Sequence, residues 1–145
     1  MLLEDDQIDE ACDRYAAADK TQWGFDDASW RLLARELRDR QEQIARRGRT
    51  ISYSELVAGT AVADLDHWYR VVGDLLLVVA DAAHEARLPM LTAVATKKAG
   101  DRPGGGFYDA ARHFGALSPG TGDDEGFWIK QLKDVYAHWH KTRSA

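Results

Sequence analysis

The sequence predicts a mainly helical α+β domain, with a small sheet of two or three strands and helices at both ends of the chain. Several segments repeat apolar residues three and four positions apart, which is the spacing of a buried helix face. One short run, residues 90–96, follows Pro89 and is typical of a strand in its length, apolarity and branched residues. With 145 residues, the chain is long enough to bury a single core without disulfides.

The composition favours a cytoplasmic protein. Cys12 is the only cysteine, so no internal disulfide can form. The first residues are acidic where a signal peptide would be basic. The longest apolar run, Leu75 to Ala80, is too short to cross a bilayer. We therefore expect neither secretion nor membrane insertion.

The net charge of −5 conceals a segregation of charge along the chain. Residues 1–20 contain seven acidic and two basic residues, whereas residues 29–49 contain seven arginines and three acidic residues. Two interpretations are open. The two segments could be helices whose charges pair with each other across their packing. Alternatively, the arginines could meet an external polyanion while the acidic helix controls access to them.

The first two predicted helices differ in how much they can bury. Residues 3–19 have only a thin apolar stripe, made of Ile8, Ala11 or Cys12, and Tyr15. This predicts a peripheral helix. Residues 29–47 have a fuller apolar face, made of Trp30, Leu33, Leu37 and Ile44. Asp27 or Ser29 can cap the start of this second helix, and Gly48 can end it.

A capping box follows the second helix. In Ser52-Tyr53-Ser54-Glu55, the serine and glutamate side chains can each satisfy the other's backbone N–H group. The helix that it starts is expected to end near Gly59 after about two turns. Residues 60–73 should add a further turn or two of helix.

The next segment should supply the middle of the core. After Gly73, Asp74 caps a helix that is apolar on most of its circumference and is therefore buried on most sides. Residues 90–96 then form the strand. Residues 97–106 are expected to be an exposed, basic and flexible loop.

The remaining residues, 107–145, are predicted to form a helical lid. A short helix from Phe107 to Phe114 should end at Gly115. The last helix, 124–141, has an apolar face made of Trp128, Leu132, Val135 and Trp139. It should pack on the core or on a second subunit. The expected single domain thus has an acidic peripheral helix (1–22), a centre (29–106) and this lid.

The order of these elements resembles the DNA-binding winged-helix part of alkylguanine-DNA alkyltransferases and alkyltransferase-like proteins. Thr50 to Leu56 is similar to the family's threonine-tyrosine-glycine-glutamate helix start. The resemblance covers about residues 30–106, and it implies a winged-helix-like centre with DNA binding as one option. The family's proline-cysteine-histidine-arginine motif is missing, because Pro89 is followed by Met90-Leu91-Thr92. The resemblance therefore does not imply alkyl transfer.

The candidate binding residues flank the capping box and the glycine-rich loop. They are Arg46, Arg47, Arg49, Tyr53, Lys97, Lys98 and Arg102. Cations at these places suit the phosphates of DNA. Arginine and the aromatic residues also dominate the energy of protein interfaces. The acidic residues Asp74, Asp81 and Glu85, in the helix that would read DNA, oppose the first option.

No complete catalytic or metal motif is found in the sequence. His138 and His140 are two apart and face different ways on a helix. Gly100 to Gly106 lacks the lysine and hydroxyl residue of a P-loop. We therefore expect no metal, cofactor or catalytic residue.

The sequence thus predicts a small non-catalytic binding or regulatory protein that acts through a protein partner, self-association or DNA. The alternative is a small enzyme of unrecognised type, with a site near loop 97–108.

Overall fold

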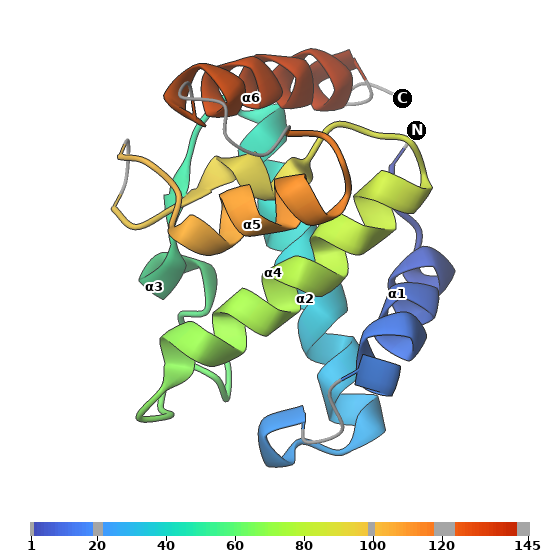
Figure 1. Ribbon diagram of the computed structural model, residues 1–145. Coiled ribbons are helices and arrows are strands. Elements are labelled where there is room, and N and C mark those ends of the chain that lie inside the picture. Colours follow the sequence, from blue (N-terminus) through green and yellow to red (C-terminus); the bar gives the residue numbers. More distant parts are fainter. Residues whose placement is uncertain (1, 19–21, 99–100, 118–123, 142–145) are drawn as a thin grey trace.

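The computed structural model describes residues 2–18, 22–98, 101–117 and 124–141. In these residues the fold is mainly helical with a two-stranded sheet, as predicted (Figure 1). The elements, in chain order, are α1 (Asp5–Ala18), η1 (Gln22–Gly24), α2 (Asp27–Arg46), β1 (Ile51–Ser52), α3 (Tyr53–Leu56), α4 (Trp68–Glu85), η2 (Leu91–Val94), β2 (Ala95–Thr96), α5 (Gly105–His113) and α6 (Asp124–Lys141). In the described residues, no helix is both long and apolar enough to span a membrane.

Helix α2 forms the centre of the fold and contacts α1, α4, η2 and α6. Trp30 and Leu37 on its inner face are completely buried. Its N-cap is Asp26, whose carboxylate accepts a hydrogen bond from the Ser29 N–H at 2.7 Å. Asp27 and Ser29, the predicted caps, are therefore already helical. Gly48 follows the helix with a φ of +66°, as expected for a glycine in that place.

Three ion pairs join α1 to α2. Asp5 pairs with Arg38, Asp9 pairs with Arg35 at 2.5 Å, and Asp13 pairs with Arg31. Because the pairs recur every four residues on one helix and every three or four on the other, they follow the antiparallel contact of the two helices. The interpretation in which the charges of the two helices pair with each other is confirmed. These arginines are neutralised within the protein.

Helix α1 lies at the edge of the fold (Figure 1), but it buries more than its thin apolar stripe predicts. Ile8, Ala11 and Cys12 are completely or almost completely buried, and α1 contacts both α4 and α2. Its apolar stripe is thin, but it is covered from two sides and is therefore part of the main core. The side chain of Tyr15 lies outside the described residues.

Helix α4 is one continuous helix, and the predicted break after Gly73 is wrong. The helix starts at Trp68 after His67 and passes through Gly73 without interruption. Asp74 does not cap it. Its carboxylate instead accepts a hydrogen bond from the Trp23 indole at 2.5 Å. Continuity is favoured because Val71, Val72 and Leu75 form one buried face across the glycine.

The prediction of a strand over residues 90–96 is correct only at its end. Leu91–Val94 is a 3₁₀ turn, and only Ala95–Thr96 pairs with β1, in parallel. Side chains of α6 bond the backbone before β2. The Met90 N–H donates to Gln131 at 3.1 Å, and the Ala93 carbonyl accepts from Trp128 at 2.9 Å. Backbone groups that are bonded in this way do not need a strand partner.

The predicted two-turn helix after the capping box is a single turn, α3. Ser52 caps it by accepting a hydrogen bond from the Glu55 N–H at 3.3 Å. Glu55 accepts a hydrogen bond from the Ser52 hydroxyl at 2.8 Å instead of bonding the serine N–H. That half of the predicted reciprocal box is therefore absent.

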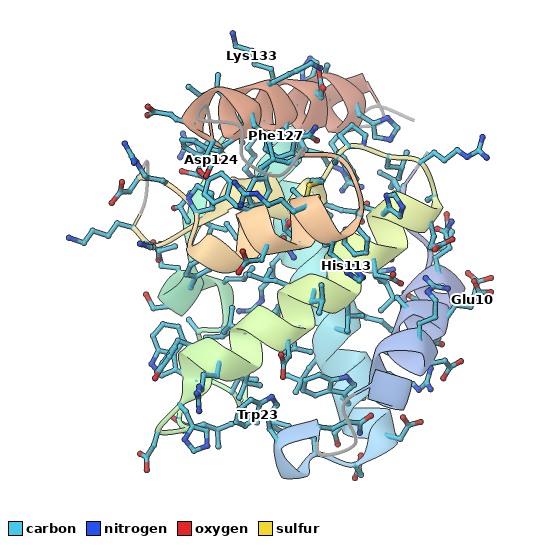
Figure 2. All side chains as sticks on the ribbon, viewed as in Figure 1. Glu10, Trp23, His113, Asp124, Phe127 and Lys133 are labelled. Atoms are coloured by element: carbon cyan, nitrogen blue, oxygen red, sulfur yellow. The ribbon has the colours of Figure 1, made fainter. Side chains whose placement is uncertain are left out.

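Helix α6 covers one end of the fold, as the predicted lid on the core. Val135 and Trp139 are completely buried. The Phe127 ring lies over the Phe107 ring of α5, with ring centroids 5.9 Å apart (Figure 2). Helix α5 and the glycine that ends it, Gly115, with a φ of +78°, also agree with the prediction.

Candidate functional site

The parallel strands bring two of the predicted site residues together. Ser52 pairs with Thr96 in the register of β1 and β2. Tyr53 follows Ser52, and Lys97 follows Thr96. Because parallel strands end at the same edge of a sheet, these two residues lie next to each other. Both line the same cavity, which has a volume of about 400 Å³.

The walls of this cavity are mainly apolar and come from α4 and α5, which lie side by side (Figure 1). Helix α4 contributes Tyr69, Val72, Gly73, Leu76, Leu77 and Ala80. Helix α5 contributes Gly106, Phe107 and Ala110. Thr92 and Gly104 complete the lining. Tyr69 is 61% exposed, so this face of α4 borders the solvent.

The phenol of Tyr53 has a fixed position in the cavity wall. Its oxygen accepts a hydrogen bond from the Gly104 N–H at 2.6 Å. A Cβ atom at Gly104 would lie only 3.3 Å from this oxygen, so the absent side chain permits the close approach. Burial raises the pKa of the phenol above its ordinary value. Tyr53 is therefore neutral at physiological pH and keeps a proton to donate.

The loop after β2 presents Lys97 and Lys98, which are both exposed. The Lys97 N–H donates to the Arg102 carbonyl at 3.1 Å, and the Thr96 hydroxyl donates to the Lys98 carbonyl. The described part of this loop is therefore held by its own hydrogen bonds. Residues 99–100, which belong to the predicted flexible loop, lie outside the described residues.

Two glycines leave open space in the cavity. A Cβ atom at Gly73 or at Gly106 would meet no atom within 4 Å. Neither residue has a positive φ. The backbone conformation and the packing of the protein would thus both accept alanine at these positions. A glycine in a helix interior costs about 0.5–1 kcal/mol relative to alanine.

A second hollow of about 630 Å³ continues along the same two helices. It shares Gly73 and Gly106 with the first cavity, but its lining includes Asp74, Asp81 and Asp109. Asp81 pairs with Arg14 at 2.5 Å. Arg14 and His113 also line this hollow, so three carboxylates stand against one arginine. The groove between α4 and α5 is therefore basic at the Lys97 end and more acidic at the other end.

The other predicted site residues do not line this cavity. Arg46 and Arg47 line a separate hollow with Tyr136 and His140, where α2 ends beside α6. Arg49 is exposed just before β1. Arg102 is also exposed and lies 3.7 Å from Glu125. The structure thus divides the predicted residues into a group before β1 and a group after β2.

The cavity wall on α4 was missed by sequence reasoning, although the signal is present. Tyr69, Val72, Leu76, Leu77 and Ala80 are spaced as one apolar stripe of a helix. This stripe lies beside the core stripe of Val71, Leu75 and Val78. The apolar residues around the helix predict burial on most sides. One of the stripes instead faces the cavity.

No group of three or more His, Cys, Asp or Glu side chains that could hold a metal ion occurs among the residues that the structure describes. Comparison with protein-family models, with curated proteins and with solved structures finds no match. The winged-helix-like centre and the enzyme site near loop 97–108 stay predictions.

Proposed function

We propose that this protein is a cytoplasmic, non-catalytic binding or regulatory protein that engages an acidic surface of a protein partner. The observation that carries the proposal is a set of exposed cations near the strand pair that α1 does not neutralise. Arg47, Arg49, Lys97 and Lys98 form no ion pair with any described residue. We call these four residues the basic edge.

The basic edge flanks the two ends of the β1–β2 pair. The segment before β1 lies beside α6, where Arg47 lines a hollow with Tyr136 and His140, and the loop after β2 lies at the left side in Figure 1. Exposed cations without internal partners are available to carboxylates of another protein, and such complementarity sets specificity and association rate. Arg46, Tyr53 and Arg102 lie next to the basic edge in the chain and complete the proposed interface.

Charge-matched variants test this proposal. The quadruple variant Arg47→Ala/Arg49→Ala/Lys97→Ala/Lys98→Ala removes the basic edge. The control Arg70→Ala/Arg87→Ala/Lys130→Ala/Lys133→Ala removes four other cations. Immobilised wild type, variant and control would be exposed to extract from the source cells. We expect partners that bind the wild type and the control at 150 mM salt but not the variant. Equal retention by all three would refute the basic edge.

DNA is the second candidate, and the same unpaired cations favour it. Phosphate contacts make binding depend steeply on salt, with a slope close to the number of phosphates neutralised. Fluorescence anisotropy of labelled duplex and single-stranded DNA at 20 and 150 mM salt separates the candidates. Steep loss of binding with salt, abolished in the quadruple variant, would favour DNA. No binding at 20 mM salt would leave the protein partner.

A further inference from the structure

We propose that the cavity between α4 and α5 binds a small amphipathic anion, which has an apolar ring or branched body and one carboxylate, phosphate or sulfonate group. The body would lie between Leu76, Leu77 and Phe107. The anionic group would face Lys97 and the Tyr53 hydroxyl. This site shares Lys97 and Tyr53 with the proposed partner surface, and its other lining residues lie outside that surface.

The size and lining of the cavity fit such a ligand. Pockets for small molecules have volumes of about 300–1,000 Å³, with apolar walls and a few convergent polar groups. The cavity has about 400 Å³ and is lined by aliphatic and aromatic side chains from two helices. Its side-chain polar groups, in the described residues, belong to Tyr53, Tyr69, Thr92 and Lys97. Buried apolar area would supply most of the affinity.

The glycines are the observation that points to an occupant. Gly73 lies in the apolar stripe of α4 at the cavity wall, and Gly106 lines the cavity from the first turn of α5. A methyl group at either position would meet nothing within 4 Å. The fold therefore tolerates a side chain that would fill this space and strengthen the helix. Both glycines are exposed, so the space beside them is open to solvent and a ligand can enter it.

The polar groups determine the charge of that occupant. The Tyr53 oxygen already accepts the Gly104 N–H, so its remaining strong interaction is to donate its own proton. Lys97 can only donate. Neither group has a described carboxylate to bond. Two donors without a carboxylate partner favour an anion or a strong acceptor, since the other polar side chains of the cavity, Tyr69 and Thr92, carry no charge.

The acidic end of the groove gives the ligand a direction. Asp74, Asp81 and Asp109 line the continuation of the cavity beyond Gly73 and Gly106. An anionic group would be repelled there and attracted at Lys97. The apolar body therefore extends from Lys97 toward α4 and α5, and the anion stays at the end formed by Tyr53.

Two fluorescent probes with the same aromatic body test the proposal. 8-Anilinonaphthalene-1-sulfonate carries an anion, whereas N-phenyl-1-naphthylamine lacks it. We expect the wild type to bind the sulfonate with a Kd on the order of 10 µM. Lys97→Met should weaken sulfonate binding about three- to tenfold and leave the neutral probe unchanged. Lys133→Met, on the outer face of α6, is the matched control (Figure 2).

Filling the cavity provides the second arm of the test. Gly73→Leu should weaken both probes at least tenfold, and Gly73→Ala should weaken them about two- to threefold while raising Tm. Near-UV circular dichroism confirms that each variant is folded, and Gly73→Ala serves if Gly73→Leu does not fold. Unchanged binding in Gly73→Ala and Gly73→Leu, or no probe binding by the wild type, would overturn the site. Equal loss of both probes in Lys97→Met would overturn the anion assignment.

Discussion

The Glu42 carboxylate on α2 accepts a hydrogen bond from the Trp139 indole on α6 at 2.7 Å. It also accepts the Leu3 N–H at 3.2 Å. One buried carboxylate thus joins the N-terminal segment, the central helix and the C-terminal helix. Burial raises its pKa above the ordinary 4.5, although both hydrogen bonds act in the opposite direction.

Glu42→Gln should change how stability depends on pH. Because the pKa in the folded state is raised, protonated Glu42 favours folding. This contribution is fully present below pH 4.5 and is lost as pH rises through the folded-state pKa. The free energy of unfolding of the wild type, relative to the variant, should therefore fall as pH rises from 4 to 7. Urea denaturation followed by tryptophan fluorescence measures it. A constant difference would show that Glu42 has the same pKa in both states.

Arg38 and Arg35 should differ in their effect on stability. The Arg38 side chain is almost fully buried and donates to the Leu3 carbonyl at 3.0 Å as well as to Asp5. Arg35 pairs with Asp9 at a partly exposed position. We expect Arg38→Ala to lower the free energy of unfolding by about 3 kcal/mol, because it leaves buried polar groups unpaired. Arg35→Ala should lower it much less, because water screens this pair. Equal losses in urea denaturation would contradict the difference in burial.

Cys12 should be inert while the protein is folded. Burial against α2 and α4 raises the pKa of the thiol to about 11, so almost none is thiolate at pH 8. Reaction with 5,5′-dithiobis(2-nitrobenzoate) at pH 8 should take hours in buffer and seconds in 6 M guanidinium chloride. One equivalent of thiol should react per chain, since Cys12 is the only cysteine. Fast reaction without denaturant would mean that α1 detaches from the core.

Tyr53→Phe should destabilise the protein more than Tyr69→Phe does. The first change removes the acceptor of the Gly104 N–H, and the second alters an exposed side chain. The expected loss for Tyr53→Phe is about 1 kcal/mol, against a few tenths for the control. Absorbance at 295 nm gives a second measurement. Tyr53→Phe should remove a tyrosine that titrates above the ordinary pKa of 10.0.

Local signals made much of the fold predictable. The periodic face of α2, the glycines after α2 and α5, and the aromatic spacing of α6 each depend on residues close in sequence. The predicted break at Gly73 failed because a glycine ends a helix only where the backbone needs a positive φ. The φ of Gly73 is not positive. The strand over residues 90–96 failed because α6, distant in sequence, bonds the backbone before β2. Distant partners of this kind leave no mark within the segment itself.

The candidate site was predictable only in part. Basic composition identified Lys97, and the capping box drew attention to Tyr53. Tyr53 and Lys97 lie together because the strand register pairs Ser52 with Thr96. Neither segment specifies this register alone. The cavity wall on α4 was not predicted, because α5, which is distant in sequence, determines how much of this apolar stripe is exposed.

The parallel pair of Ile51 with Ala95 has a consequence for the order of folding. The chain between them includes α3, all of α4 and η2. Closing so long a loop costs entropy that a sheet of two residue pairs cannot offset alone. We therefore expect the helices to assemble first and the strands to join last. Since Tyr53 and Lys97 meet only when the strands join, an intermediate with native helices would lack the binding cavity, and ligand binding would report the final step of folding.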